Sequence, residues 1–325
     1  MVKDKLQIFI ITYNRKRLLI RTLNSILSEQ SPVKDYDITV IDNASTDGTS
    51  DVIKEFSEKF SNIKHLRHPY NIGGNANICR AFELAASCGK EYAWILCDDD
   101  VYDFSNWSEV EENINNKKDI ICVSDYSFPS EADKTNPAYQ IFQLTFVPAS
   151  IFRTDAMSSS VLTNMYDNIY AMFQQTCLTA KVMNNNGSIH VLSKPIVHNG
   201  IHCKDRAENI SLTRGYCKNS VSERREKTTW ILGFAAVISL FKDKQLILDC
   251  FENAILYKDI CDTWKIFYKT MCNEYFHFKY FNYFYEVFKY LKPERKRELI
   301  LYISLIPFKR IQTALRVVCF MLRYR

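Results

Sequence analysis

The stretch "LQIFIIT", residues 6 to 12, is an apolar run of the kind that forms a parallel β-strand buried on both faces. The segment that follows it places four apolar residues at helical spacing, namely Leu19, Leu23, Ile26 and Leu27. A buried strand followed at once by an amphipathic helix is the beginning of a βαβ unit. The stretch therefore predicts an α/β domain built on a parallel sheet.

The alternation of strand and helix continues through the first 125 residues. We expect further strands at "DITVID" (37–42), "IKHLR" (63–67), "YAWIL" (92–96) and "IICVSD" (120–125). Between them, apolar residues again recur at helical spacing: Val52, Phe56 and Phe60, then Ile78, Phe82 and Ala85. In such open α/β sheets, ligands bind in the crevice beyond the carboxyl ends of the strands.

Polar residues directly follow three of these strands. They are Thr12 to Arg15 after the first strand, Asp42 to Gly48 after the second, and Asp98 to Asp100 after "YAWIL". Turn chemistry explains any single cluster, because Asp and Asn gather in turns. Three acid-bearing or amide-bearing loops on one sheet edge favour a ligand site instead. A dinucleotide fold would need G-x-G-x-x-G and a P-loop protein G-K-[ST], and the sequence has neither.

Length and cysteine usage narrow the class of protein. The chain has 325 residues, 47% of them hydrophobic, which is enough for a full core plus an appendage. Its eleven cysteines include no C-x-x-C pair, which argues against a disulfide framework or a zinc site. The apolar run at Leu6 leads into polar residues rather than a cleavage site, so we expect a cytoplasmic protein without a signal sequence.

Positive charge is concentrated near the C-terminus. Residues 293 to 325 hold eight Lys or Arg and two Glu, a net charge of +6, which leaves −1 for residues 1 to 292 out of a total of +5. A nucleic-acid-binding core would carry its own basic face, so we expect no nucleic acid partner. In "FKRIQTALRVVCFMLRYR" (308–325), basic residues flank an apolar helical stripe, which is typical of a helix lying on a membrane surface. Val317 and Phe320 lie off the stripe, so packing against the protein's own core is the alternative.

Four ordered motifs carry a resemblance to a known family. They are "ITYNR" (11–15), "VIDNASTDGTSDVI" (40–53), "NIGGNANICRAFELA" (71–85) and "LCDDDV" (96–101). In this order and spacing they resemble glycosyltransferase family 2, which implies a GT-A type transferase that uses a nucleotide-sugar donor. The resemblance is specific over about residues 5 to 125 and weakens between 126 and 200.

The resemblance implies a donor site on the predicted sheet edge. The segment from Thr12 to Arg15 would hold the nucleotide base, and Asp42 would bond to the base or ribose. Gly73 and Gly74 would let the chain pass close to a ligand. Arg80 would reach a phosphate, although an ordinary surface arginine is the alternative. The full donor-binding set is Thr12, Tyr13, Asn14, Arg15, Asp42, Asn43, Ser45, Asn71, Gly73, Gly74, Arg80, Asp98 and Asp99.

The acid triplet resembles the D-x-D metal motif of the family. Asp98 would lie toward the ribose and the metal, Asp100 would be a direct ligand, and Asp99 takes the variable middle position. His198, in "KPIVHNG", would be a third ligand. Hard cations such as Mn²⁺ or Mg²⁺ prefer carboxylate oxygens together with substrate phosphates, so either ion is the expected cofactor.

The catalytic base is the weakest part of the resemblance. The family often has an acidic pair about eleven residues before a Gly, but counting back from Gly187 leads to Gln174, Gln175 and Thr176. Asp167 is the nearest acid and our candidate base, with Asp155 next, and either could instead cap a helix. The missing pair leaves a non-catalytic nucleotide-sugar-binding protein of a glycan assembly complex as the alternative function. A nucleotidyltransferase would need a Gly-rich loop where Thr12 to Arg15 stand.

The sequence therefore predicts a mostly parallel, Rossmann-like GT-A sheet flanked by helices in residues 1–225. A helical C-terminal region with the basic amphipathic tail is expected in residues 226–325. The expected reaction is an inverting transfer of a sugar from a nucleotide diphosphate donor, a UDP-sugar, to a hydroxyl of a glycan or lipid-linked acceptor in surface polysaccharide or glycolipid synthesis. The tail would hold the protein on the inner face of the cell membrane.

Overall fold

The computed structural model describes residues 1–124, 133–169 and 173–198, together with residues 237, 240–243, 245, 246 and 250. The expected strand end at Asp125 lies outside the described residues, as do the amphipathic tail at 308–325 and most of the expected helical region at 226–325. Among the helices that are described, none is both long and apolar enough to span a membrane.

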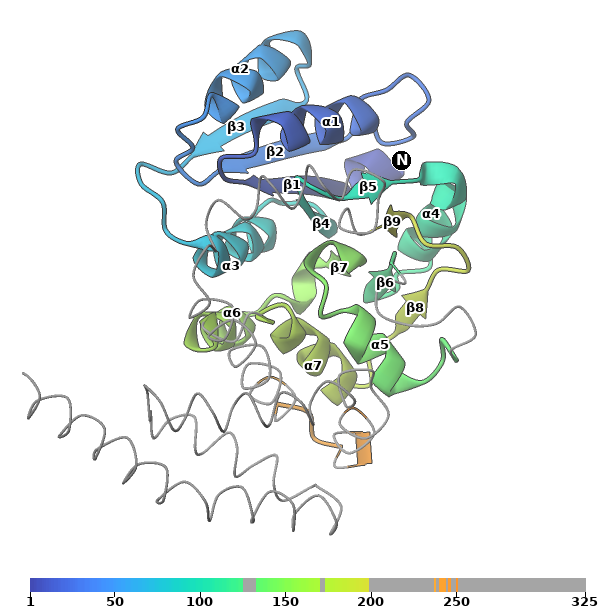
Figure 1. The fold of residues 1–325 in the computed structure, drawn as a ribbon. Helices are drawn as coiled ribbons and strands as arrows, with labels where there is room; N and C mark the ends of the chain where they lie inside the picture. The colour runs from blue at the N-terminus through green and yellow to red at the C-terminus, as the bar shows by residue number, and fades with distance from the viewer. Residues whose placement is uncertain are drawn as a thin grey trace, which may run out of the picture.

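A mixed sheet forms the centre of the described chain. In the described residues it has seven strands in the order β3-β2-β1-β4-β7-β6-β8, and Figure 1 shows helices packed around it. Four neighbouring strands are parallel: β3 (Ile63–Arg67), β2 (Asp37–Asp42), β1 (Leu6–Thr12) and β4 (Tyr92–Cys97). Strand β7 (Ser150–Arg153) runs antiparallel to β4 and to β6 (Ile120–Cys122), and β8 (Ile189–Val191) is parallel to β6. The expected mostly parallel α/β sheet is confirmed.

The helices cover both faces of this sheet. They are α1 (Lys16–Ile26), α2 (Thr49–Lys59), α3 (Gly74–Ala86), α4 (Trp107–Asn115), α5 (Pro137–Gln143), α6 (Ser159–Asp167) and α7 (Thr176–Asn184). Short 3₁₀ segments lie at η1 (Val2–Asp4), η2 (Phe104–Asn106), η3 (Val147–Ala149) and η4 (Thr154–Ala156). A two-stranded antiparallel sheet joins β5 (Val101–Tyr102) to β9 (Val197–His198).

Alternation along the central strands divides the core into two layers. In β1, Phe9 packs in the layer that contains Phe82 of α3, whereas Ile8 and Ile10 pack in the layer that contains Leu19 of α1. Successive residues of a strand point to opposite faces, so a strand that is apolar throughout must be covered on both sides. The predicted helical stripe of α1 is fully inside, because Leu19, Leu23 and Ile26 are all 0% exposed.

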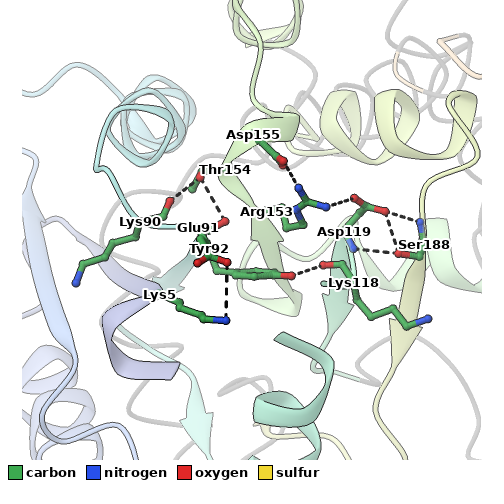
Figure 2. Close-up of polar contacts among 10 residues, drawn as sticks. All are labelled: Lys5, Lys90, Glu91, Tyr92, Lys118, Asp119, Arg153, Thr154, Asp155 and Ser188. Carbon is green, nitrogen blue, oxygen red and sulfur yellow. Dashed lines mark hydrogen bonds and ion pairs between the residues drawn. The ribbon is translucent and has the colours of Figure 1, made fainter. Parts of the chain in front are cut away.

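The antiparallel strand β7 is held at the sheet edge where β4, β6 and β8 begin. Figure 2 shows Arg153 at the end of β7 paired with Asp119 and Asp155. Asp119 Oδ2 accepts hydrogen bonds from the Ser188 amide at 2.7 Å and the Ser188 hydroxyl at 2.9 Å. The Tyr92 hydroxyl donates to the Lys118 carbonyl at 2.8 Å. This network joins four strands at the edge opposite the acid triplet.

Candidate functional site

The three polar clusters lie together at the carboxyl ends of neighbouring strands. In the parallel register, Thr12 of β1 is opposite Asp42 of β2, and Ile11 of β1 is opposite Cys97 of β4. The acid triplet starts at the next residue, Asp98. The predicted convergence of the three loops on one edge is therefore confirmed.

Asp98 is a buried carboxylate that the first polar segment holds in place. It is 2% exposed, its Oδ2 accepts a 2.6 Å hydrogen bond from Thr12 Oγ1, and its Oδ1 accepts a 2.8 Å hydrogen bond from Arg15 Nη1. Thr22 Oγ1, on α1, donates to the Asp98 carbonyl at 2.9 Å. Burial raises the pKa of Asp98 to about 6, against the opposing effect of Arg15.

Asp99 and Asp100 supply oxygen atoms suited to a divalent cation. Among the described residues, ligand atoms of Cys97, Asp99 and Asp100 lie within 4.8 Å of one another. Burial and the three neighbouring carboxylates raise the pKa of the Cys97 thiol well above its usual value, so the protonated thiol is a poor ligand for Mg²⁺ or Mn²⁺. The two carboxylates fit a hard cation that completes its shell with water or phosphate oxygens.

The other two expected metal ligands are placed differently. Asp98 is not part of this ligand group, and its two oxygens already accept hydrogen bonds from Thr12 and Arg15. His198 lies in β9 directly opposite Val101, so its backbone runs beside the end of the triplet. The structure thus brings His198 to the edge that carries the acid triplet, and metal binding by Asp98 and His198 stays a prediction.

Asp42 is fully buried, and other residues of the chain contact both of its carboxylate oxygens. Its Oδ1 accepts the Ser45 amide at 2.9 Å, and its Oδ2 lies 3.3 Å from Arg67 Nε and also accepts from the Ser50 hydroxyl. Burial alone would raise the pKa of Asp42, but the His65 imidazole 3.9 Å away and hydrogen bonds from Ser45 and Ser50 hold it well below its usual range. Asp42 is therefore an ionised side chain that also shapes the loop after β2.

Asparagine side chains link the loops of the site. Asn14 lies in the left-handed region at φ 51°. Its backbone N–H donates to Ser45 Oγ at 2.9 Å, and its side-chain Oδ1 accepts a hydrogen bond from the Thr46 backbone N–H at 2.7 Å. Asn43 Nδ2 donates to Asn71 Oδ1 at 2.9 Å. These contacts tie the loops after β1, β2 and β3 to one another, while Tyr13 is half-buried in the first of them.

The glycine pair leaves open space at the start of a helix. Gly73 caps α3 with φ 88°, a conformation that favours glycine, and Gly74 is the first helical residue. A Cβ at either position would meet no atom within 4 Å in the described chain. The first turn of α3 contains no acidic residue. Unpaired backbone amides and the helix dipole make such an end suited to an anion such as a phosphate.

Arg80 forms an ion pair with a neighbour on the same helix. Its Nη1 lies 2.5 Å from Glu83 Oε1, and its side chain is 37% exposed. Glu83 also accepts a hydrogen bond from Tyr166 at 3.0 Å. This arrangement matches the surface-arginine alternative, and phosphate contact by Arg80 stays a prediction.

Asp167 lies at the exposed C-terminal end of α6, close to the start of α3. The carbonyl of Ile169 accepts hydrogen bonds from Asn75 Nδ2 at 2.8 Å and from Gln174 Nε2 at 2.9 Å, which joins the chain after α6 to the first turn of α3. Asp155, in contrast, is paired with Arg153 at the opposite edge of the sheet (Figure 2). The geometry therefore favours Asp167 over Asp155 as a base candidate.

The segment where the family often has an acidic pair is buried and uncharged. Gln174, Gln175 and Thr176 are 0%, 2% and 0% exposed. Gln174 Oε1, Gln175 Oε1 and Thr176 Oγ1 are buried without a hydrogen-bond partner in the described chain. No carboxylate replaces the missing pair within this segment.

Two residues of α1 contact the acid triplet although the sequence did not single them out as site residues. Arg21 Nη2 donates to the Asp99 carbonyl at 2.7 Å, and Thr22 bonds to the Asp98 carbonyl. Thr22 had a detectable signal, because it is a polar residue on the same helical stripe as Leu19 and Ile26. Arg21 had none, since arginines on helices are usually solvated.

The fold and this edge define an α/β domain of GT-A type. A family model described as "Glycosyl transferase family 2" matches residues 7–178, which is more than half of the chain. The chain therefore belongs to glycosyl transferase family 2.

Similar proteins include two curated bacterial transferases and a solved archaeal structure. Abequosyltransferase RfbV of Salmonella typhimurium is 32% identical over 34% of this chain and 32% of its own length. The poly(ribitol-phosphate) beta-glucosyltransferase of Bacillus spizizenii is 25% identical over 49% of this chain and 26% of its own length. The mannosyltransferase PcManGT from Pyrobaculum calidifontis, solved with GDP-Man and Mn²⁺, has a TM-score of 0.54 at 12% identity, covering 94% of this chain and 87% of that structure, and it shows the fold alone. The chain spans about a third or less of the two curated relatives.

Proposed function

We propose that this protein is a metal-dependent, inverting glycosyltransferase. It would move a sugar from a nucleotide diphosphate donor, a UDP-sugar, to a hydroxyl of a glycan or lipid-linked acceptor. The observation that carries the proposal is the meeting of three features on one sheet edge: the acid triplet, the loops after β1 and β2, and the open N-terminus of α3. Family membership and the two curated transferases support surface polysaccharide or glycolipid synthesis as the setting.

Each part of the edge has a role in donor binding. The loops at Thr12 to Arg15 and at Asp42 would hold the base and ribose, and the first turn of α3 would receive the diphosphate. Asp99 and Asp100 would hold Mn²⁺ or Mg²⁺. When bound, the ion supplies charge neutralisation to the departing nucleoside diphosphate.

The acceptor proton must pass to a base for direct displacement. We assign this role to Asp167, because the residues that follow it are bonded to the first turn of α3 and because it is exposed to an incoming acceptor. A base must lie within hydrogen-bond reach of the proton it removes, and its geometry often tightens only in the complex.

The remaining regions complete the proposal. Residues 1–225 would form the transferase domain and residues 226–325 a helical region. The basic stripe at 308–325 would place the protein on the inner face of the cell membrane, near a lipid-linked acceptor.

A second candidate function is a non-catalytic nucleotide-sugar-binding protein of a glycan assembly complex. The uncharged segment from Gln174 to Thr176 favours it, since no carboxylate stands where the family often has two. Both functions require donor binding, and only the first requires sugar transfer.

Two measurements separate these functions. Calorimetric titration of UDP with and without MnCl₂ tests the donor site, and we expect metal-dependent binding. Single-turnover transfer from a panel of radiolabelled UDP-sugars to a lipid-linked acceptor mixture then tests catalysis. Binding without any transfer would support the non-catalytic function, and the absence of nucleotide binding would contradict both.

A further inference from the structure

One arginine nitrogen bridges two carboxylates of the acid cluster. Arg15 Nη1 lies 2.8 Å from Asp98 Oδ1 and 2.8 Å from Asp99 Oδ2. The side chain of Asp98 is 2% exposed, that of Asp99 is 22% exposed, and that of Arg15 is 31% exposed. The inner contact to Asp98 is therefore sheltered from water, while the outer contact to Asp99 is partly solvated. The chain itself supplies positive charge to its acid cluster.

A divalent cation on Asp99 would compete with this arginine. A metal–oxygen bond is about 2.1 Å for Mg²⁺, so an ion on Asp99 Oδ2 would lie within about 5 Å of Arg15 Nη1, given the 2.8 Å between that nitrogen and the same oxygen. Two cations at that separation repel each other, and the partly buried surroundings weaken the screening by water. Arg15 and a metal ion therefore cannot both occupy Asp99 without a cost.

Within the donor-binding segment from Thr12 to Arg15, the arginine is the residue suited to the diphosphate rather than to the base, so a nucleotide bound at this edge would offer it an alternative partner. A guanidinium carries five donors in a planar fork, and a single nitrogen makes both carboxylate contacts here. Arg15 caps the N-terminus of α1, directly after the loop at Thr12 to Asn14. A diphosphate is a strong bidentate acceptor for arginine, so a nucleotide would offer Arg15 new partners at the moment when a metal repels it.

We propose that Arg15 is the resident counter-ion of the acid cluster and that it exchanges Asp99 for the donor diphosphate when a divalent cation binds. The proposal rests on the proposed function, because the diphosphate is that of the nucleotide-sugar donor. It makes metal binding and nucleotide binding cooperative. By thermodynamic linkage, UDP must strengthen Mn²⁺ binding by the same factor by which Mn²⁺ strengthens UDP binding.

The test measures binding of Mn²⁺ alone, followed by binding in the presence of UDP. Free Mn²⁺ is followed by electron paramagnetic resonance in wild type and in Arg15→Gln. Arg17→Gln is the matched control, because it removes the same charge from an exposed position two residues along the chain. We expect Arg15→Gln to bind Mn²⁺ alone about fivefold more tightly, the scale of a partly exposed ion pair. UDP should then enhance Mn²⁺ binding less in Arg15→Gln than in wild type, and Arg17→Gln should follow wild type.

Different outcomes overturn different parts of the proposal. Equal or weaker Mn²⁺ binding by Arg15→Gln would show that Arg15 does not compete for Asp99. An undiminished UDP enhancement in that variant would overturn the exchange. If wild type binds no UDP at any Mn²⁺ concentration, the proposed function fails and the exchange with it, whereas tighter binding of Mn²⁺ alone by Arg15→Gln would still support the counter-ion role. If Arg15→Gln does not give a cooperative thermal transition, Arg15→Lys replaces it. The lysine side chain is shorter, so its ammonium reaches the two carboxylates less well; Mn²⁺ alone should again bind more tightly than to wild type, and equal or weaker binding would contradict the proposal.

Discussion

We expect the free energy of unfolding to fall as the pH rises from 5 to 7, because buried Asp98 loses its proton over this range. Asp98→Asn should remove this part of the pH dependence. The carboxylate is 2% exposed, and burial raises its pKa from 3.8 to about 6. A group whose pKa is higher in the folded state than in the unfolded state favours folding below its unfolded pKa and loses that benefit as the pH rises through its folded pKa. The relevant window therefore lies between about pH 4 and pH 7.

The magnitude follows from the two pKa values of Asp98. With a folded pKa of about 6 and an unfolded value of 3.8, the free energy of unfolding should fall by about 1 kcal/mol between pH 5 and pH 7, out of a total of about 3 kcal/mol. Other shifted acids act elsewhere. The pKa of Asp42 lies well below its usual range and hydrogen bonds lower the pKa of Glu109 to about 2, so the stability that both contribute is constant above about pH 5 and is lost only as the pH falls further.

Urea denaturation at pH 5, 6 and 7, in EDTA, measures this effect as the difference between wild type and Asp98→Asn. That difference should change by about 1 kcal/mol across the range. Thr12→Val is the control, because it keeps the carboxylate but removes its 2.6 Å hydrogen-bond donor, so the pH dependence should persist and shift to higher pH. A wild-type and Asp98→Asn difference that is constant between pH 5 and pH 7 would refute the assignment of a raised pKa to Asp98.

Four further predictions address the metal, the base, the core and the tail. Asp100→Asn should abolish Mn²⁺-dependent UDP binding while the thermal melting temperature stays near wild type, and unchanged calorimetric affinity would remove Asp100 from the metal site. Asp167→Asn should slow sugar transfer by about 10²-fold with donor binding preserved, whereas near-normal single-turnover rates would exclude it as the base. Gly187→Ala should lower the free energy of unfolding by about 1–3 kcal/mol, because the added Cβ would lie 2.5 Å from a valine methyl. Gly74→Ala is the control and should not lower it, because a Cβ there would meet no atom within 4 Å in the described chain. Equal urea midpoints for the two variants would contradict the packing at Gly187. Deleting residues 308–325 should abolish sedimentation with anionic liposomes and leave transfer to a soluble acceptor intact, and a truncated protein that still sediments would argue against membrane attachment.

Most of the fold could be predicted because its signals are local. Strands β1 and β4 are apolar runs, helices with regular apolar spacing lie between the strands, and a strand that is buried on both faces shows this pattern in its own residues. Strand β7 could not be predicted in this way. It has four residues, "SIFR", too few to show a period, and its antiparallel pairing with β4 and β6 depends on segments distant along the chain. Strand β6 was expected to continue to residue 125 but ends at Cys122, after which Ser124 only bridges to Val197.

The sequence by itself determined which polar residues would meet, because loops that follow parallel strands must share one edge of the sheet. Thr12, Asp42 and Asp98 were placed together by that rule alone. Only the tertiary structure decided how the acids are used. Arg15, a residue 83 positions away from Asp98, pairs with both Asp98 and Asp99, and the oxygens of Asp99 and Asp100 lie close together. The physical reason is that charge pairing depends on distances of a few ångströms between side chains from different elements, and no local pattern along the chain encodes those distances.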